Sequence, residues 1–186
     1  DSYVPNPDKY EVESWVENLE IPWELVFLSD ERALVTERPG RIRLIVDGEL
    51  LAKPYLNLEE EVAHVGEGGL MGLAVHPDCP EEPYLSVMHT YRENFNLYNG
   101  IARIRHHGNV GKLDGFIIEN IPGGRIHDGG RIRFGPDRLL YITTGEIGNA
   151  EVAQDRDNLA GKILRVEADG SIPDDNPIPG SPVYSY

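Results

Sequence analysis

The stretch His127–Glu146, HDGGRIRFGPDRLLYITTGE, decides how the rest of this chain is interpreted. It holds two short runs in which apolar and polar residues alternate, 131–134 (RIRF) and 140–143 (LYIT). Such alternation is typical of half-buried β-strands. The residues between the runs, 135–137 (GPD), suit a tight turn. The stretch therefore predicts a β-hairpin.

The two ends of this hairpin carry residues suited to acid–base chemistry. His127 stands just before the first run and Glu146 just after the second. Because the open ends of an antiparallel hairpin lie side by side, we expect the two side chains to meet. A histidine held by a carboxylate is the usual arrangement of a general base. Turn and surface residues of the same types are common at strand ends, so the spacing alone leaves that alternative open.

The same strand–turn–strand plan recurs along the chain. An apolar strand end, a gap of two residues and a turn aspartate occur three times, each followed by a β-run that contains threonine. The aspartates lie 48 and 59 residues apart, near the period of propeller blades, which is roughly 40–50 residues. Generic hairpins would give some chance matches, but three in order favour a β-propeller over a β-sandwich. The matches are Phe27-x-x-Asp30 with Thr36, Val75-x-x-Asp78 with Thr90, and Phe134-x-x-Asp137 with Thr143.

Short runs of β-forming residues predict an all-β chain with about three four-stranded antiparallel blades. Because propellers close with about four to eight blades, we expect residues 1–186 to form a single domain that is a partial propeller, truncated relative to the complete protein. Pairing of two copies into a closed ring, a homodimer, is the alternative. The predicted strands are 25–28, 33–37, 41–46, 70–75, 84–91, 101–105, 115–118, 131–134, 140–143, 162–166 and 183–184.

Charge and composition exclude several classes of partner. The 186-residue chain has a formal net charge of −15 and a pI of about 4.7. Such a surface repels phosphate backbones and anionic lipid, so we expect no nucleic acid partner. No apolar run reaches the roughly 20 residues that span a bilayer. Cys79 is the only cysteine, which rules out an internal disulfide.

Four stretches carry a resemblance to a known family. They are 21–42 (IPWELVFLSDERALVTERPGRI), 66–78 (GEGGLMGLAVHPD), 127–146, and 158–177 (NLAGKILRVEADGSIPDDNP). In this order they resemble the soluble glucose/sorbosone dehydrogenases, quinoprotein aldose dehydrogenases that use pyrroloquinoline quinone (PQQ). The resemblance implies a six-bladed β-propeller with PQQ on its top face near the central axis. It also implies oxidation of the C1 hydroxyl of aldose sugars to the lactone.

The resemblance further implies roles for three residues. His127 matches the family's catalytic base, which takes the hydroxyl proton as hydride passes to the quinone. Glu146 matches an acidic position beside that histidine, where Asp is more frequent. Glu67 matches a position, often Gln, in the loop that lines the cofactor and sugar pocket. A carboxylate there could accept hydrogen bonds from sugar hydroxyls but would repel the anionic cofactor.

Other parts of the family pattern are missing from this chain. The family continues after the equivalent of 182–186 with an Arg-Asn pair, the calcium ligands and the basic residues that hold the PQQ carboxylates. We therefore expect no metal ligands here, and we expect the chain alone to be inactive because its PQQ and calcium sites need the missing part. The resemblance also implies an external electron acceptor and a periplasmic or extracellular location.

Two other functions remain as alternatives. A non-catalytic propeller that binds a partner is favoured by the missing cofactor half and opposed by the retained His127 and Glu146. A metal-dependent lactonase would need a cluster of carboxylates and Asn that the sequence does not show. Among the other histidines, His76 is predicted to be a turn residue, and His106 and His107 are predicted to be exposed.

Overall fold

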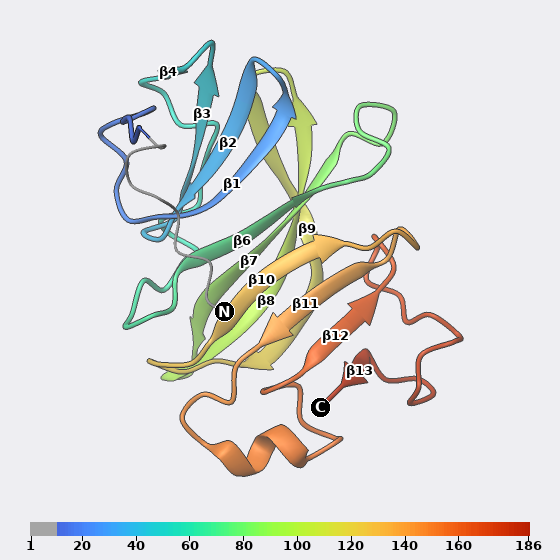
Figure 1. Cartoon of the computed structure of the whole chain (residues 1–186). Coiled ribbons are helices and arrows are strands. Elements are labelled where there is room, and N and C mark those ends of the chain that lie inside the picture. Colours follow the sequence, from blue (N-terminus) through green and yellow to red (C-terminus); the bar gives the residue numbers. More distant parts are fainter. Residues whose placement is uncertain (1–10) are drawn as a thin grey trace.

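The computed structural model describes residues 11–186, which form three antiparallel β-sheets (Figure 1). Residues 1–10, which the sequence assigns to the same domain, lie outside the described part. The elements are β1 (Pro22–Ser29), β2 (Arg32–Glu37), β3 (Arg41–Val46), β4 (Glu49–Leu50), β5 (Leu56–Asn57), β6 (Leu70–Val75), β7 (Tyr84–Glu93), β8 (Asn96–His107), β9 (Val110–Pro122), β10 (Gly129–Phe134), β11 (Leu140–Thr144), the 3₁₀ helix η2 (Ala150–Gln154), β12 (Ile163–Val166) and β13 (Val183–Ser185).

Each sheet follows the chain from its first strand to its last. The orders are β1-β2-β3-β4, with β5 also paired to β3, then β6-β7-β8-β9, and then β10-β11-β12-β13. The predicted all-β architecture of three blades is therefore confirmed. The predicted strand 162–166 begins one residue later than expected, and β4 and β5 were not predicted because two residues give no pattern. Within residues 11–186, no helix is long and apolar enough to cross a membrane.

The three sheets are arranged as consecutive propeller blades. Their first strands β1, β6 and β10 lie next to one another, and each sheet continues away from them (Figure 1). Both faces of β6 are covered, because Leu70 and Leu73 join the core between the first two sheets whereas Met71 and Ala74 join the core between the second and third. This explains why β6 is a continuous apolar run rather than an alternating one.

The repeated threonine has the same structural cause in each blade. In each blade, the pairing of the first strand with the second contains a register shift. The threonine hydroxyl accepts a main-chain N–H from a residue at or next to that shift. The hydroxyl thereby satisfies a donor next to an irregularity in the ladder. The three bonds run from the N–H of Glu24 to Thr36 (3.1 Å), of Gly69 to Thr90 (3.1 Å) and of Arg131 to Thr143 (3.0 Å).

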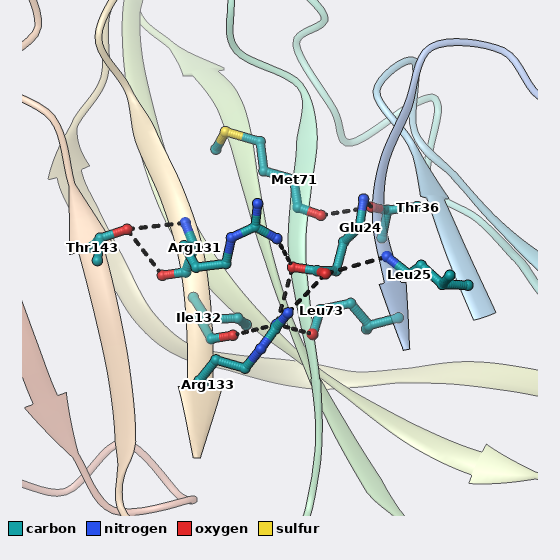
Figure 2. Close-up of polar contacts among 9 residues, drawn as sticks. All are labelled: Glu24, Leu25, Thr36, Met71, Leu73, Arg131, Ile132, Arg133 and Thr143. Carbon is teal, nitrogen blue, oxygen red and sulfur yellow. Dashed lines mark hydrogen bonds and ion pairs between the residues drawn. The ribbon is translucent and has the colours of Figure 1, made fainter. Parts of the chain in front are cut away.

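A cluster of Glu24, Arg131 and Arg133, here called the inter-blade brace, joins β1 to β10 across β6 (Figure 2). Arg133 donates Nη2 to Glu24 Oε1 (2.8 Å) and Nη1 to Oε2 (3.0 Å), and Arg131 donates Nη1 to Oε2. Burial by itself would raise the pKa of Glu24, but the hydrogen bonds from the two arginines outweigh it and the pKa is lowered. The brace therefore holds a buried carboxylate in its charged form.

Candidate active site

Three chain segments meet at the end of the second and third blades where β6 and β10 begin. The loop 66–69 precedes β6, residues 123–128 join β9 to β10, and residues 145–149 follow β11. Main-chain hydrogen bonds tie them together, from Glu67 N to Arg125 O (2.9 Å) and from Ile147 N to His127 O (3.2 Å). The three segments carry Glu67, His127 and Glu146, so the structure brings all three predicted site residues together.

His127 contacts both of the other predicted residues. Its main-chain N–H donates to Glu67 Oε2 (2.6 Å), and its imidazole Nδ1 is hydrogen-bonded to Glu146 Oε1. The expected meeting of the two hairpin ends is confirmed, and the pairing of Gly129 with Thr144 in β10 and β11 produces it. The imidazole is 54% exposed, which leaves Nε2 as the nitrogen that a ligand can approach.

The main chain of His127 adopts a conformation that few residues other than glycine take. Its φ is +56°, in the left-handed region. For a residue with a side chain this costs about 1 kcal/mol or more, and it persists only where the surroundings impose it. Here Glu67 holds the N–H and Ile147 holds the carbonyl. The direction of the imidazole therefore depends on two neighbouring loops.

Two glycines allow these loops to approach so closely. A Cβ at Gly145 would lie 1.6 Å from the carbonyl oxygen of His127. A Cβ at Gly66, whose φ is +62°, would lie 2.0 Å from the carbonyl oxygen of Arg125. Both distances are too short for any side chain, so these positions require glycine. The glycines beside Glu67 and Glu146 in the sequence thus serve the assembly of the site.

The charge states of His127 and Glu146 are coupled. The hydrogen bond and the negative charge of Glu146 raise the pKa of His127 above its ordinary value. The same hydrogen bond lowers the pKa of Glu146. The imidazole is therefore a neutral base only above its raised pKa, and once protonated it has a carboxylate that stabilises the new charge.

A cleft of about 500 Å³ opens beside this pair. Glu146, Thr144, Lys162 and Tyr186 are among its lining residues, whereas His127 and Glu67 are not, so the cleft adjoins the histidine rather than containing it. The Lys162 ammonium is buried, and burial lowers its pKa. It donates to the carbonyls of Val152 (2.7 Å), Ala153 (3.0 Å) and Ala160 (2.7 Å), so it holds η2 in place.

The remaining histidines have structural surroundings. His76 Nδ1 accepts the main-chain N–H of Asp78 (3.2 Å), which confirms its predicted turn role. His107 is exposed as predicted, but the same prediction for His106 is wrong. His106 is partly buried and its Nδ1 lies 2.7 Å from the Tyr55 hydroxyl, because Tyr55 of the first blade packs over the end of β8. Within residues 11–186, no three or more His, Cys, Asp or Glu side chains are grouped to hold a metal ion.

Reasoning from the sequence missed two residues that shape the site. Arg38 donates Nη2 to the carbonyls of Gly66 and Gly68 (3.1 Å for the latter), and thereby supports the loop that carries Glu67. Asp128 is buried directly after the exposed His127. No spacing rule singles out Arg38, whereas the position of Asp128 beside the candidate base was a signal that went unused.

Comparison with known proteins assigns this geometry to a family. The family model of the glucose/sorbosone dehydrogenases matches residues 19–186. The chain belongs to this family. The resemblance noted from the four sequence stretches is therefore confirmed, and with it the assignment of the three sheets to a β-propeller.

Solved structures and a named relative agree with this assignment. A candidate oxidoreductase (glucose dehydrogenase) from Thermus thermophilus matches with a TM-score of 0.85 and 45% sequence identity. The match covers 94% of this chain and 52% of the Thermus chain. The PQQ-bound aldose sugar dehydrogenase of Streptomyces coelicolor has a TM-score of 0.83 and 34% identity, covering 92% and 52%. Aldose sugar dehydrogenase YliI of Escherichia coli K12 is 30% identical to this chain, and the match covers 92% of this chain and 47% of the length of YliI. The chain thus spans about half the length of the relatives it matches.

Proposed function

We propose that the protein, at the full length of its relatives, is a PQQ-dependent aldose sugar dehydrogenase. It would oxidise the C1 hydroxyl of an aldose to the lactone by general-base-assisted hydride transfer. The observation that carries the proposal is the exposed imidazole of His127, whose Nδ1 is held by Glu146 and whose main chain is held by Glu67. The family assignment supports sugar dehydrogenase activity at the coarser level.

In this proposal His127 acts as the general base. Its Nε2 takes the proton of the C1 hydroxyl, and the electron pair of that O–H bond forms the second C–O bond of the lactone carbonyl. The hydrogen on C1 then leaves with its electron pair as hydride. Bound PQQ would supply the two-electron acceptor for that hydride. Glu146 keeps the proton of the neutral imidazole on Nδ1 and stabilises the imidazolium that forms.

We propose that the residues present form the sugar-facing part of one wall of a PQQ site, because the Glu67 carboxylate would repel the anionic cofactor itself. An imidazole open to solvent lies together with glycine-rich main chain and with the carboxylates of Glu67 and Glu146. Glu67 Oε2 already holds the His127 N–H, and we propose its second oxygen for a ligand hydroxyl. The carboxylates of PQQ need cations and calcium needs further oxygen ligands. We assign both to the part of the relatives' length that this chain does not span.

Further parts of the proposal concern the surroundings of the reaction. An external electron acceptor would reoxidise the cofactor, and the location would be periplasmic or extracellular. The alternative of a non-catalytic binding propeller is not favoured, because the pair formed by His127 and Glu146 is kept in the geometry that a base requires.

Reconstitution tests the proposal. The protein at its native length is mixed with PQQ and calcium, and dye reduction is followed with a panel of aldoses, beside a His127→Ala variant. We expect aldose-dependent reduction that collapses in the variant. Unchanged activity in the variant would remove His127 from the chemistry. Failure of the folded native-length protein to bind PQQ would overturn the quinoprotein assignment.

A further inference from the structure

A single buried side chain anchors the segment that presents His127. Asp128 is 3% exposed, whereas the histidine before it projects into solvent. Asp128 Oδ1 accepts hydrogen bonds from Asn99 Nδ2 (2.9 Å) and from Gly124 N (2.8 Å), and its carbonyl accepts one from Gly145 N (3.1 Å). One residue thus ties β8, the turn before the histidine and the segment that leads to Glu146.

The anchor continues as a chain of buried hydrogen bonds. Asn99 Oδ1 accepts a bond from Thr90 Oγ1 (2.7 Å), and that hydroxyl accepts one from Gly69 N (3.1 Å). Thr90 and Asn99 are both 0% exposed. Gly69 belongs to the loop 66–69, which carries Glu67. The buried chain therefore connects the two loops whose ends meet at the main chain of His127.

The exposed pair needs such an anchor. An ion pair in contact with water contributes little to holding its own geometry. Misplacement of a reacting group by about 1 Å can cost on the order of a hundredfold in rate. Burial of Asp128 also costs free energy, because its Oδ2 has no hydrogen-bond partner among the described residues. Buried carboxylate oxygens in that state are rare, and they call for a reason beyond packing.

We propose that Asp128 is a positioning residue of the active site. Its carboxylate fixes the main chain that aims the His127 imidazole at Glu146. Through Asn99 and Thr90 it also sets the position of the loop that carries Glu67. This inference rests on the proposed role of His127 as the base, and it adds the residue that determines where the base points.

The test compares three variants of the native-length protein. Asp128→Ala removes the acceptor for both hydrogen bonds, whereas Asp128→Asn keeps an oxygen that can accept them. Asn176→Ala is the matched control. Asn176 lies in the loop before β13, is also buried (5% exposed), and is hydrogen-bonded to Arg165 of β12 and to Ser181. The apparent pKa of His127 is measured by NMR on protein with ¹⁵N-labelled histidine, with the signal assigned by loss in His127→Ala.

We expect Asp128→Ala to return the pKa of His127 toward its ordinary value and to lower kcat about ten- to a hundredfold. Asp128→Asn and Asn176→Ala should keep the raised pKa. Asn176→Ala should nevertheless lower the midpoint of thermal unfolding, which separates a loss of stability from a loss of positioning. If Asp128→Ala is destabilised but keeps the pKa of His127, the inference is overturned.

A further variant, Thr90→Val, covers the case in which Asp128→Ala does not fold. Thr90→Val keeps the shape of the side chain but breaks the buried chain between Asn99 and Gly69. We expect displaced amide signals for Glu67 and Gly69 and a lowered pKa of His127, and an unchanged spectrum would count against the inference. Because these readouts need no sugar oxidation, they separate failure of this inference from failure of the proposed dehydrogenase activity.

Discussion

Two charged clusters on and beside the same strand, β10, differ in their exposure to water. At its start, His127 meets Glu146 with the imidazole 54% exposed. Within it, Arg131 and Arg133 reach across β6 to Glu24, whose side chain is only 5% exposed (Figure 2). The first cluster can gain or lose a proton because water and ligands reach it. The second keeps its carboxylate charged near neutral pH, because the hydrogen bonds from the two arginines outweigh the effect of burial and lower the pKa of Glu24.

The difference shows that burial determines whether an ion pair contributes to stability or remains free to exchange protons. A buried charge that loses its partner is strongly destabilising, whereas an exposed pair adds little to stability. The brace therefore belongs to the assembly of the blades, and the exposed pair belongs to chemistry. Both take residues from the hairpin stretch His127–Glu146. Four variants, two of them with a matched control, test this division.

The largest effect is expected from His127→Ala. Without the base, kcat of the native-length protein should fall about a thousandfold. The midpoint of thermal unfolding should change little, because the imidazole is exposed. Steady-state kinetics and a thermal melt of the same sample check both statements. A large loss of stability with little loss of activity would reverse the comparison.

Arg133→Met should act on stability instead. Removing one partner of buried Glu24 should lower the free energy of unfolding by about 3 kcal/mol, measured by urea denaturation. Because the pKa of Glu24 is lowered in the fold, the stability it contributes is present above its unfolded-state pKa and is lost as pH falls through the folded value. The variant should therefore lose part of this acid sensitivity.

The control for Arg133→Met is Arg103→Met. Arg103 pairs with Asp114 at 2.7 Å, with both side chains substantially exposed (32% and 27%). Loss of this pair should cost less than about 1 kcal/mol. Equal costs for the two variants would contradict the view that burial distinguishes the brace.

Glu146→Gln should move the pH dependence of the reaction. Glu146 raises the pKa of His127, so the native base becomes neutral only above that raised value. In the variant the rise of kcat/KM with pH should begin at lower pH, because the imidazole loses its proton more easily. The plateau should fall about tenfold to a hundredfold, since the imidazolium is no longer stabilised. An unshifted profile would argue against the pair as the acid–base unit.

Leaving the two controls aside, the smallest effect is expected from Thr36→Val. The Thr36 hydroxyl accepts the Glu24 N–H (3.1 Å) and donates to the Met71 carbonyl (2.7 Å), and the residue is fully buried. Its loss should cost about 1–2 kcal/mol in a urea titration. Thr143→Val, at the equivalent but partly exposed position beside Arg131, should cost about half as much. A larger cost at Thr143 would contradict the importance of burial.

Much of this protein followed from local pattern in the sequence. The hairpin, the three repeated units and the meeting of His127 with Glu146 depend on antiparallel register, which turn residues and strand alternation determine over short distances. The turn role of His76 followed in the same way. These features need no knowledge of how the blades pack.

Other features were decided only when the blades came together. Glu67 holds the main chain of His127, Glu24 receives two arginines from the third blade, and Tyr55 covers His106. Asp128 is linked to Asn99 in the neighbouring sheet. Each contact joins segments far apart in sequence. For the contacts of Glu24, Tyr55 and Asp128, burial selects the partners because it removes water as a competitor for hydrogen bonds, whereas the exposed contact of Glu67 with His127 depends on the close approach of two loops. Sequence pattern thus determined the strands and the candidate base, whereas inter-blade packing determined which buried groups hold that base in place.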